Sequence, residues 1–441
     1  MANAMILIQA ALVIALIAIG VRYKGMAIGL FGGLGVLIFA LVFGVAPGPV
    51  PVSAMLIILA VVTAAGTMQL AGGVDYLVSI AEKMIRKFPS QITYIAPLTT
   101  FLFCAGAGTG NIYYSLMPVI YEVSYAAGIR PERPLSLSAT AGQLAITSSP
   151  VSAAMAAMVG LMVPLKFTLT DILFIVFPAS LLAILVGGFV MNRIGAELKD
   201  DVEYQRRLAA GEIAPPAAAG EAKEIPASAK LAAGLFMGGL AIIILAGLFE
   251  ALHPHVMSKG KSQPLDMSLF IEMTMLGVSA LIVALCGVKA SGIPKSSLFG
   301  SGLVAVVALF GVAWMANTFI AANEEVIVGG LGEIAKSAPL LISVALFAVA
   351  AITTSQSSTT FSIIPIGIAL GIPPQFLAAM WPSIVGVFLL PTNGSQIASV
   401  EIDQTGTTRI GKFVINHSFL VPVSVFTIVS VGVGLLIASV R

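Results

Sequence analysis

Four short runs of hydroxyl, amide and glycine residues interrupt apolar stretches of this 441-residue chain. They read AGAGTGN at 105–111, TSSPVS at 147–152, TTSQSSTT at 353–360 and PTNGS at 391–395. Backbone N–H groups at the start of a helix, helped by Ser, Thr and Asn side chains, can hold an anion without a formal positive charge. The four runs therefore predict a binding site for a small anion, built from neutral groups.

Two of these runs contain residues that end or begin helices. Ser149 precedes Pro150, which predicts a helix N-cap followed by a first helical residue whose missing N–H has no cost. Gly108 and Gly110 allow a tight tip with positive φ. We expect Asn111 to open the helix that follows this tip.

Ionisable residues are missing from the middle of the predicted spans. Asp75, Glu122 and Glu272 lie nearer span ends, whereas a proton relay or a voltage sensor would place such groups deep in the membrane. The charge is therefore expected on the ligand. The two cysteines lie in apolar runs, and the three histidines form no metal-ligand pattern, so we expect no metal, no cofactor and no disulfide.

Three other interpretations stay open. Small and hydroxyl residues also serve helix packing in membranes. Ser148 or Ser149 could be the nucleophile of an intramembrane hydrolase, but His417, the one histidine near a span, has no obvious Asp partner. A channel would line its pore with rings of like groups, and paired hairpins fit that less well. We predict no enzymatic activity.

The composition places the chain in a membrane. Hydrophobic residues make up 58% of it and charged residues 10%, whereas soluble domains carry about 25% charged residues. A net charge of +2 gives no indication of a nucleic-acid partner. About ten spans of roughly 20 apolar residues are expected. They are 4–21, 26–45, 53–80, 135–163, 170–192, 230–252, 267–287, 298–322, 377–398 and 413–440.

Two further apolar stretches, 91–126 and 338–372, are too long for one span and are broken near the middle, so we predict two re-entrant hairpins. Basic clusters at 83–87 and 130–133 flank the first, and both favour the cytoplasm. The first span is kept as a helix with its N-terminus outside, because no basic residue precedes it. Both termini are then outside, and of 22 basic residues only five face outside: Lys166, Lys259, Lys261, Lys336 and Arg441.

A charged segment at 193–229, rich in Ala, Pro and Glu, predicts a partly disordered cytoplasmic linker. It separates 1–192 from 230–441, and each half has three spans, a hairpin, a broken span and a last span. The second half starts on the opposite face. The chain is therefore predicted to be an all-α integral membrane protein with two inverted repeats, which is common in secondary transporters.

Longer motifs point to one family. They are GGVDYLVSIAEKMIRKFP at 72–89, AGTGNI at 107–112, RPERPLS at 130–136, ITSSPVSAA at 146–154, GVAWMANTF at 311–319 and GTTRIGKFVINHSF at 406–419. With these motifs the chain resembles, over nearly its whole length, the anaerobic C4-dicarboxylate transporter (Dcu) family, DcuA/DcuB-like, within a wider ion-transporter superfamily.

The resemblance implies exchange of fumarate, malate, succinate and aspartate across the cytoplasmic (inner) membrane of a bacterium by alternating access. It also implies a homodimer, in which scaffold spans (4–80 and 230–322) form the interface and a transport domain slides as an elevator. The implied partners are small dicarboxylate anions, the lipid bilayer and a second copy of the chain. Coupling to Na+ or H+ in a symporter stays open.

Carried over residue by residue, the resemblance places substrate contacts in both halves. The first half would use Gly108, Thr109, Gly110 and Asn111 at the hairpin tip, with Ser148, Ser149 and Pro150 in the broken span. The second half would use Ser355, Gln356 and Ser357, with Pro391, Thr392 and Asn393. Family members tend to read Pro-Thr-Tyr-Pro where this chain has Pro391-Thr392-Asn393-Gly394, so the preferred dicarboxylate stays open.

Overall fold

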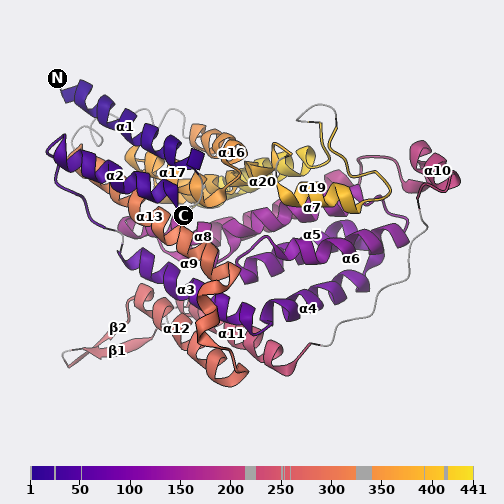
Figure 1. Ribbon diagram of the computed structural model, residues 1–441, viewed down its shortest axis with the longest axis horizontal. Coiled ribbons are helices and arrows are strands. Elements are labelled where there is room, and N and C mark those ends of the chain that lie inside the picture. Colours follow the sequence, from indigo (N-terminus) through magenta and orange to yellow (C-terminus); the bar gives the residue numbers. More distant parts are fainter. Residues whose placement is uncertain are drawn as a thin grey trace.

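The computed structural model describes residues 2–23, 26–50, 52–213, 225–249, 252, 254–258, 260–323, 340–391, 393–411 and 416–440. Within these residues the regular structure is helical apart from one antiparallel β-hairpin and a single β-bridge between Ile410 and His417. The hairpin consists of β1 (His255–Ser258) and β2 (Lys261–Pro264), and His255 pairs with Pro264 (Figure 1). The helices form two groups, here called the frame group and the site group.

The frame group combines helices from both halves of the chain. α2 packs on α13 and α3 packs on α12, while α1 flanks α2 and α11 flanks α12. α3 also contacts α13, and α4 contacts α11. The bounds are α1 (Ala2–Tyr23), α2 (Ala27–Leu41), α3 (Val52–Leu70), α4 (Gly73–Lys87), α11 (Ala227–Leu248), α12 (Met267–Cys286) and α13 (Ser297–Ala322).

Glycines make the closest contact in the frame group. A Cβ built on Gly311 of α13 would lie 1.7 Å from the carbonyl oxygen of Gly29 on α2, and one on Gly29 would lie 2.0 Å from that of Val307. Small residues allow membrane helices to approach until their backbones touch. The crossing of α2 and α13 therefore leaves no room for a side chain.

The span predicted at 53–80 is bent in its second part. α3 ends at Leu70, and the chain turns by 73° before α4 starts at Gly73. Gly72 makes this turn with φ +79°, which a residue with a Cβ adopts only under strain. α4 is amphipathic: Leu77, Ala81 and Ile85 are buried, while charged side chains such as Lys83 and Lys87 are exposed.

The site group contains both predicted hairpins and both predicted broken spans. α5 packs on α7, α16 on η7, α17 on α8, and α9 on α20. Its core includes fully buried Phe101, Phe361, Trp381 and Phe426. The bounds are α5 (Ile92–Ala107), α6 (Ile112–Ala126), α7 (Glu132–Leu144), η2 (Ala145–Ser148), α8 (Ala153–Met162), α9 (Leu169–Met191), α16 (Leu341–Thr353), α17 (Gln356–Ala369), α18 (Pro374–Met380), η7 (Trp381–Phe388), α19 (Gly394–Ile402) and α20 (Leu420–Ser439).

The two groups meet along a few helices. α3 and α13 of the frame group contact α8, and α13 also contacts α17. At the other end of α3, α4 packs against α5 and α6. Short 3₁₀ segments connect several of these helices: η1 (Pro89–Gln91), η3 (Val163–Leu165) and η6 (Ala290–Lys295).

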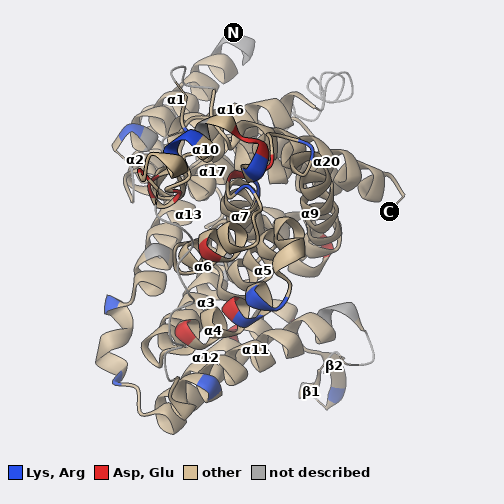
Figure 2. Cartoon of the chain, turned by 90° about the vertical axis from the view of Figure 1, so that its right-hand side faces the viewer, with Lys and Arg blue, Asp and Glu red and all other residues tan. Residues whose placement is uncertain are grey.

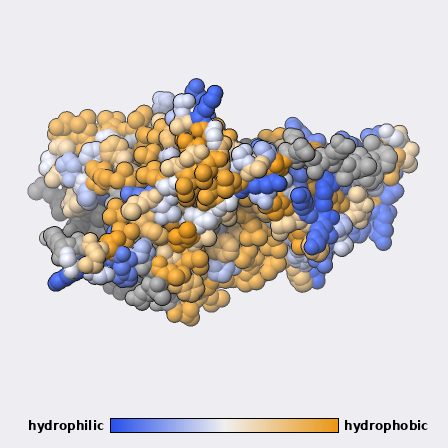
Figure 3. All heavy atoms as spheres, turned by 90° about the horizontal axis from the view of Figure 1, so that it is seen from below, coloured by the Kyte–Doolittle hydropathy of each residue, from blue (hydrophilic) through white to orange (hydrophobic). Residues whose placement is uncertain are grey.

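Six helical segments of the described chain are long and apolar enough to cross a membrane, or seven with the bent α3–α4 pair. The six are Glu132–Leu165, Leu169–Met191, Ala227–Ala246, Met267–Cys286, Ser297–Phe319 and Leu420–Ser439. The predicted total of about ten also included shorter apolar helices, Met5–Gly20, Ala27–Leu41 and Pro374–Phe388. A broad hydrophobic surface covers the body, and hydrophilic residues gather at the end that carries α10 (Val202–Ala209) (Figure 3).

The first part of the linker is held to the site group by ion pairs. It contains η4 (Leu198–Asp200) and α10 (Val202–Ala209). Arg130 bonds Glu132 and Asp201, each at 2.6 Å, and Arg133 bonds Glu197 at 2.7 Å. Figure 2 shows charged residues gathered around α10, α7 and nearby helix ends. Burial would lower the pKa of the Arg130 guanidinium, but its carboxylate partners raise it overall.

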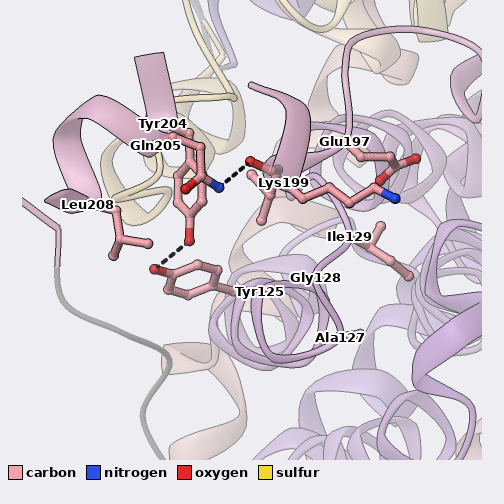
Figure 4. Close-up of a pocket in the computed structure, with 10 residues that line it drawn as sticks. Tyr125, Ala127, Gly128, Ile129, Glu197, Lys199, Tyr204, Gln205 and Leu208 are labelled. Atoms are coloured by element: carbon pink, nitrogen blue, oxygen red, sulfur yellow. Dashed lines mark hydrogen bonds between the residues drawn. The ribbon is translucent and has the colours of Figure 1, made fainter. Parts of the chain in front are cut away.

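A pocket of about 540 Å³ lies between this ordered linker and the end of the first hairpin (Figure 4). The Tyr204 hydroxyl donates to the Tyr125 hydroxyl at 3.2 Å, and Gln205 Nε2 donates to the Leu198 carbonyl at 3.0 Å. Residues 197–213 of the predicted linker thus form ordered structure against the site group. Residues 214–224 lie outside the described chain.

Candidate ligand-binding site

The tip of the first hairpin spans 108–111. Gly108 ends α5 with φ +74°, and Asn111 precedes the first residue of α6. The Asn111 backbone N–H donates to Thr109 Oγ1 at 3.2 Å, while the Asn111 side chain makes no cap hydrogen bond and is exposed. Asn111 therefore stands where the sequence predicts it, at the start of α6.

The break in the first broken helix spans 149–152, between η2 and α8. Ser152 is the N-cap of α8: its Oγ accepts from the Met155 N–H at 3.0 Å and donates to the Ile146 carbonyl at 2.7 Å. The predicted cap, Ser149 followed by Pro150, is wrong by three residues. Ser149 is extended, and its Oγ accepts from the Val151 N–H at 3.2 Å.

The tip of the second hairpin also has a left-handed residue that is followed by a helix N-cap. Thr354 takes φ +52° after α16, and Ser355 is the N-cap of α17. Ser355 Oγ accepts from the Ser358 N–H at 3.2 Å. Gln356 is buried and Ser357 half-buried.

The second break lies between η7 and α19. Asn393 and Gln396 form a capping box, in which Gln396 Oε1 accepts from the Asn393 N–H at 3.2 Å. Gln396 Nε2 also donates to the Phe388 carbonyl at 3.0 Å. Pro391 is half-buried. Thr392, a predicted contact residue, lies outside the described residues.

Contacts bring these four segments together. A Cβ on Gly108 would lie 2.8 Å from the Val151 carbonyl oxygen, so the first tip touches the first break. Gln356 Nε2 of the second tip donates to the Gln143 carbonyl at the end of α7, at 2.9 Å. A Cβ on Gly394 would lie 2.7 Å from Tyr114 Oη, so the second break touches the start of α6.

The frame group closes one side of the first tip. A cavity of about 60 Å³ there is lined by Thr109 and Asn111 of the tip, Val151 of the break, and Val62 and Leu298 of the frame group. One water occupies about 30 Å³ of liquid volume, so this cavity matches a few waters.

The polar groups of the site are neutral. Helices α8, α17 and α19 each present first-turn N–H groups at a tip or a break, and these carry partial positive charge. The flanking aromatics serve packing: Tyr113 is buried and its Oη bonds Ser399 Oγ at 2.6 Å, while Trp381 Nε1 donates to Thr360 Oγ1 at 2.9 Å. An anion is the ligand that this arrangement favours.

A serine hydrolase arrangement is not found in the described part of the chain. Ser148 Oγ donates to Ser180 Oγ at 3.1 Å, and His417 Nε2 contacts the Leu389 carbonyl oxygen at 2.9 Å. Neither Ser148 nor Ser149 meets a histidine there. The same described residues hold no group of three metal-ligating side chains.

Sequence reasoning missed Gln143 and Tyr114 as members of this junction. The only local signal for Gln143 is an amide within AGQLAITSSP, one turn before the break. The exposed side chain of Tyr114 carries its hydroxyl next to Gly394 of the second break.

Comparison with known proteins gives one consistent result. The family described as "Anaerobic c4-dicarboxylate membrane transporter" matches residues 5–441. C4-dicarboxylate transporter DcuA of Helicobacter pylori (strain 26695) is 38% identical over 442 residues, which cover 98% of each chain. Anaerobic C4-dicarboxylate transporter DcuB of Escherichia coli O6:H1 is 37% identical over 424 residues, 94% of each.

A solved structure shares the fold at low sequence identity. MtrF of Neisseria gonorrhoeae, presented as one of a class of antimetabolite efflux pumps, aligns with a TM-score of 0.53 and 15% identity. The alignment covers 90% of this chain and 83% of MtrF.

Proposed function

This chain belongs to the anaerobic C4-dicarboxylate membrane transporter family, and from that premise we propose that it exchanges C4-dicarboxylates by alternating access. It is a multi-pass protein of the bacterial inner membrane. Fumarate, malate, succinate and aspartate are the proposed cargo, and the proposal includes a periplasmic position for both termini. The observation that carries the proposal is that the two uncharged hairpin tips meet at Gln143, while the first break contacts Gly108 and the second break contacts Tyr114.

Two carboxylates need two sets of donors. The first tip and break come from one half of the chain, and the second tip and break come from the other. A four-carbon dianion placed between them can direct one carboxylate to each half. Hydrogen bonds from neutral donors to a charged acceptor are worth about 1.5–3 kcal/mol each, so a few such bonds suffice for binding.

The same proposal assigns the frame group as the scaffold and the site group as the moving transport domain, with scaffold helices also forming a homodimer. Repeated contacts support two inverted repeats: α2 on α13 matches α12 on α3, α1 on α2 matches α11 on α12, and α5 on α7 matches α16 on η7. Sliding would occur where α3 and α13 contact α8 and α17, and where α4 contacts α5 and α6.

Counterflow in liposomes tests the exchange. Purified protein is reconstituted with internal unlabelled succinate, and uptake of labelled fumarate, succinate or aspartate is followed without ion gradients. Uptake that depends on internal dicarboxylate supports exchange. Uptake only under a Na+ or H+ gradient would make the protein a symporter, and no uptake under any gradient would overturn the dicarboxylate assignment.

Cross-linking tests the sliding of the two groups. Val62 of α3 and Ala153 of α8 line the same 60 Å³ cavity from opposite groups. With Cys104 and Cys286 replaced by Ala, a short bifunctional maleimide joining Val62→Cys to Ala153→Cys should stop transport. The control pair, Val62→Cys with Leu298→Cys, lies within the frame group and should leave transport intact when joined. Equal transport from both linked pairs would refute the sliding motion.

A further inference from the structure

Gln143 lies where both hairpin tips meet the first broken helix. It stands in the last turn of α7, which ends at Leu144. Its carbonyl oxygen accepts from Gln356 Nε2 of the second tip at 2.9 Å. On its other side, a Cβ built on Gly110 of the first tip would lie 2.9 Å from Gln143 Nε2. Both hairpins therefore touch one residue, one through its backbone and one through its side chain.

The Gln143 side-chain amide makes no hydrogen bond within the described chain, although the residue is half-buried. Neighbouring polar side chains differ in this respect. Gln356 Nε2 is used on the Gln143 carbonyl, and Gln396 Nε2 on the Phe388 carbonyl. Asn393 Oδ1 accepts from Ser395. An unpaired, partly buried amide is unfavourable unless a ligand or water completes it.

The nearest described neighbours of this amide leave its N–H groups available to a ligand between the tips. Gly110 next to Nε2 brings no side chain, and the exposed Asn111 amide follows directly on the same tip. An Nε2 group offers two N–H donors. Within the described chain, the Asn111 amide of the first tip and the Gln143 amide of α7 therefore lie next to Gly110 without a protein hydrogen bond.

Resting on the proposed function, we propose that Gln143 Nε2 donates to a substrate carboxylate and helps to select dianions, while Gln356 acts as a positioning residue that holds Gln143 through its carbonyl. The hydrogen bond from Gln356 Nε2 to the Gln143 carbonyl also joins the two halves of the site. A displacement of the second tip would move the Gln143 carbonyl, and with it the amide beside the first tip.

An isosteric change tests the role of the donor. Gln143→Glu keeps the shape but replaces the NH₂ group with a carboxylate oxygen, which repels a dianion. Binding of fumarate to purified protein is measured by calorimetry at several pH values, always against the unaltered protein, so that protonation of the ligand cancels. At pH 7 we expect the affinity to fall by at least about tenfold. For Gln143→Ala we expect the affinity for fumarate to fall by about ten- to a hundredfold.

The pH profile separates this role from a structural one. A glutamic acid has an ordinary pKa of about 4.3, and a nearby dianion raises it. The affinity of Gln143→Glu relative to the unaltered protein should therefore recover as pH falls toward 5, because the protonated acid can donate again. The matched control is Gln91→Glu, an exposed position at the far end of α5, which should bind normally at every pH.

The outcomes separate the two levels of inference. If the unaltered protein neither binds nor exchanges dicarboxylates, the proposed function fails and this assignment fails with it. If it binds and Gln143→Glu binds equally well at pH 7, only the assignment fails. Should Gln143→Glu not fold, Gly110→Ala takes its place, since the added methyl displaces Nε2 without changing charge. Unchanged affinity in that variant would overturn the role of Gln143.

Discussion

Gly108 allows a quantitative test of how tightly the first hairpin tip fits the first break. It has φ +74°, and a Cβ there would lie 2.8 Å from the Val151 carbonyl oxygen and 3.0 Å from the Val151 carbonyl carbon. Gly108→Ala therefore combines two penalties. A left-handed conformation costs about 1–2 kcal/mol for a residue with a Cβ, and forcing extra volume into packed structure adds about 1–3 kcal/mol.

The chain offers a matched control for the first penalty. Gly128 ends the same hairpin with φ +71°, and nothing lies within 4 Å of a Cβ built there. Gly128→Ala should therefore lose only the conformational part, about 1–2 kcal/mol. Because Val151 belongs to the break itself, only Gly108→Ala should also move the proposed binding groups.

The assay combines thermal unfolding in detergent with counterflow in liposomes. We expect Gly128→Ala to lower the unfolding temperature modestly and to retain transport. Gly108→Ala should lower it further and reduce transport at least tenfold. If the two variants unfold alike and transport alike, the contact between the tip and Val151 has no functional weight, and the assignment of the site to this junction is refuted.

Three further tests address other parts of the molecule. Asn111→Ala should remove a charge-assisted hydrogen bond worth about 1.5–3 kcal/mol, a ten- to hundredfold loss of substrate affinity; normal affinity would exclude Asn111 from the site. Arg130→Met should lower the free energy of unfolding by about 3–5 kcal/mol, because it removes the guanidinium that bonds the buried carboxylate of Glu132 and also bonds Asp201; the exposed Arg193→Met is the control, and equal effects would contradict the reasoning. Cysteines at the exposed positions Ser90 and Ala127, in a background without Cys104 and Cys286, should both react with an impermeant maleimide from the cytoplasmic side, whereas reaction from opposite sides would rule out a re-entrant first hairpin.

The sequence predicted the positions of the tips and breaks because their chemistry is local. Gly108 takes positive φ and Asn111 opens α6, as glycine and asparagine commonly do. The family predicted from the motifs is confirmed. The choice among three nearby serines was not predictable in this way. Ser152 caps α8 while its hydroxyl also donates to the Ile146 carbonyl, six residues back, and no local preference for an N-cap includes that second bond.

Features that depend on residues far apart in the sequence were also missed, because local preferences carry no information about such contacts. The Gln143 carbonyl bonds Gln356, 213 residues away. A glutamine inside a helix is ordinary in sequence terms, since glutamine is a good helix former. Asp201 meets Arg130 across 71 residues, which orders a linker segment whose composition resembles disorder. The hydropathy of residues 53–80 likewise does not indicate the turn at Gly72.

The neutrality of the site bears on why exchange, rather than net uptake, suits this architecture. Moving one elementary charge across a membrane changes the free energy by about 2.3 kcal/mol for each 100 mV of membrane potential. A dianion in a neutral site carries two charges across the membrane, so its movement changes the electrical free energy by about 4.6 kcal/mol per 100 mV. When the cell interior is negative, the potential opposes inward movement of the dianion. The tips and breaks contain no lysine or arginine to offset this charge.

When a second dianion returns in the same site, the charges moved in the two directions cancel, and the potential no longer opposes the cycle. A neutral site thus makes one-for-one exchange of dianions independent of membrane potential, whereas the same site working alone in net uptake would need coupled cations to remove that opposition.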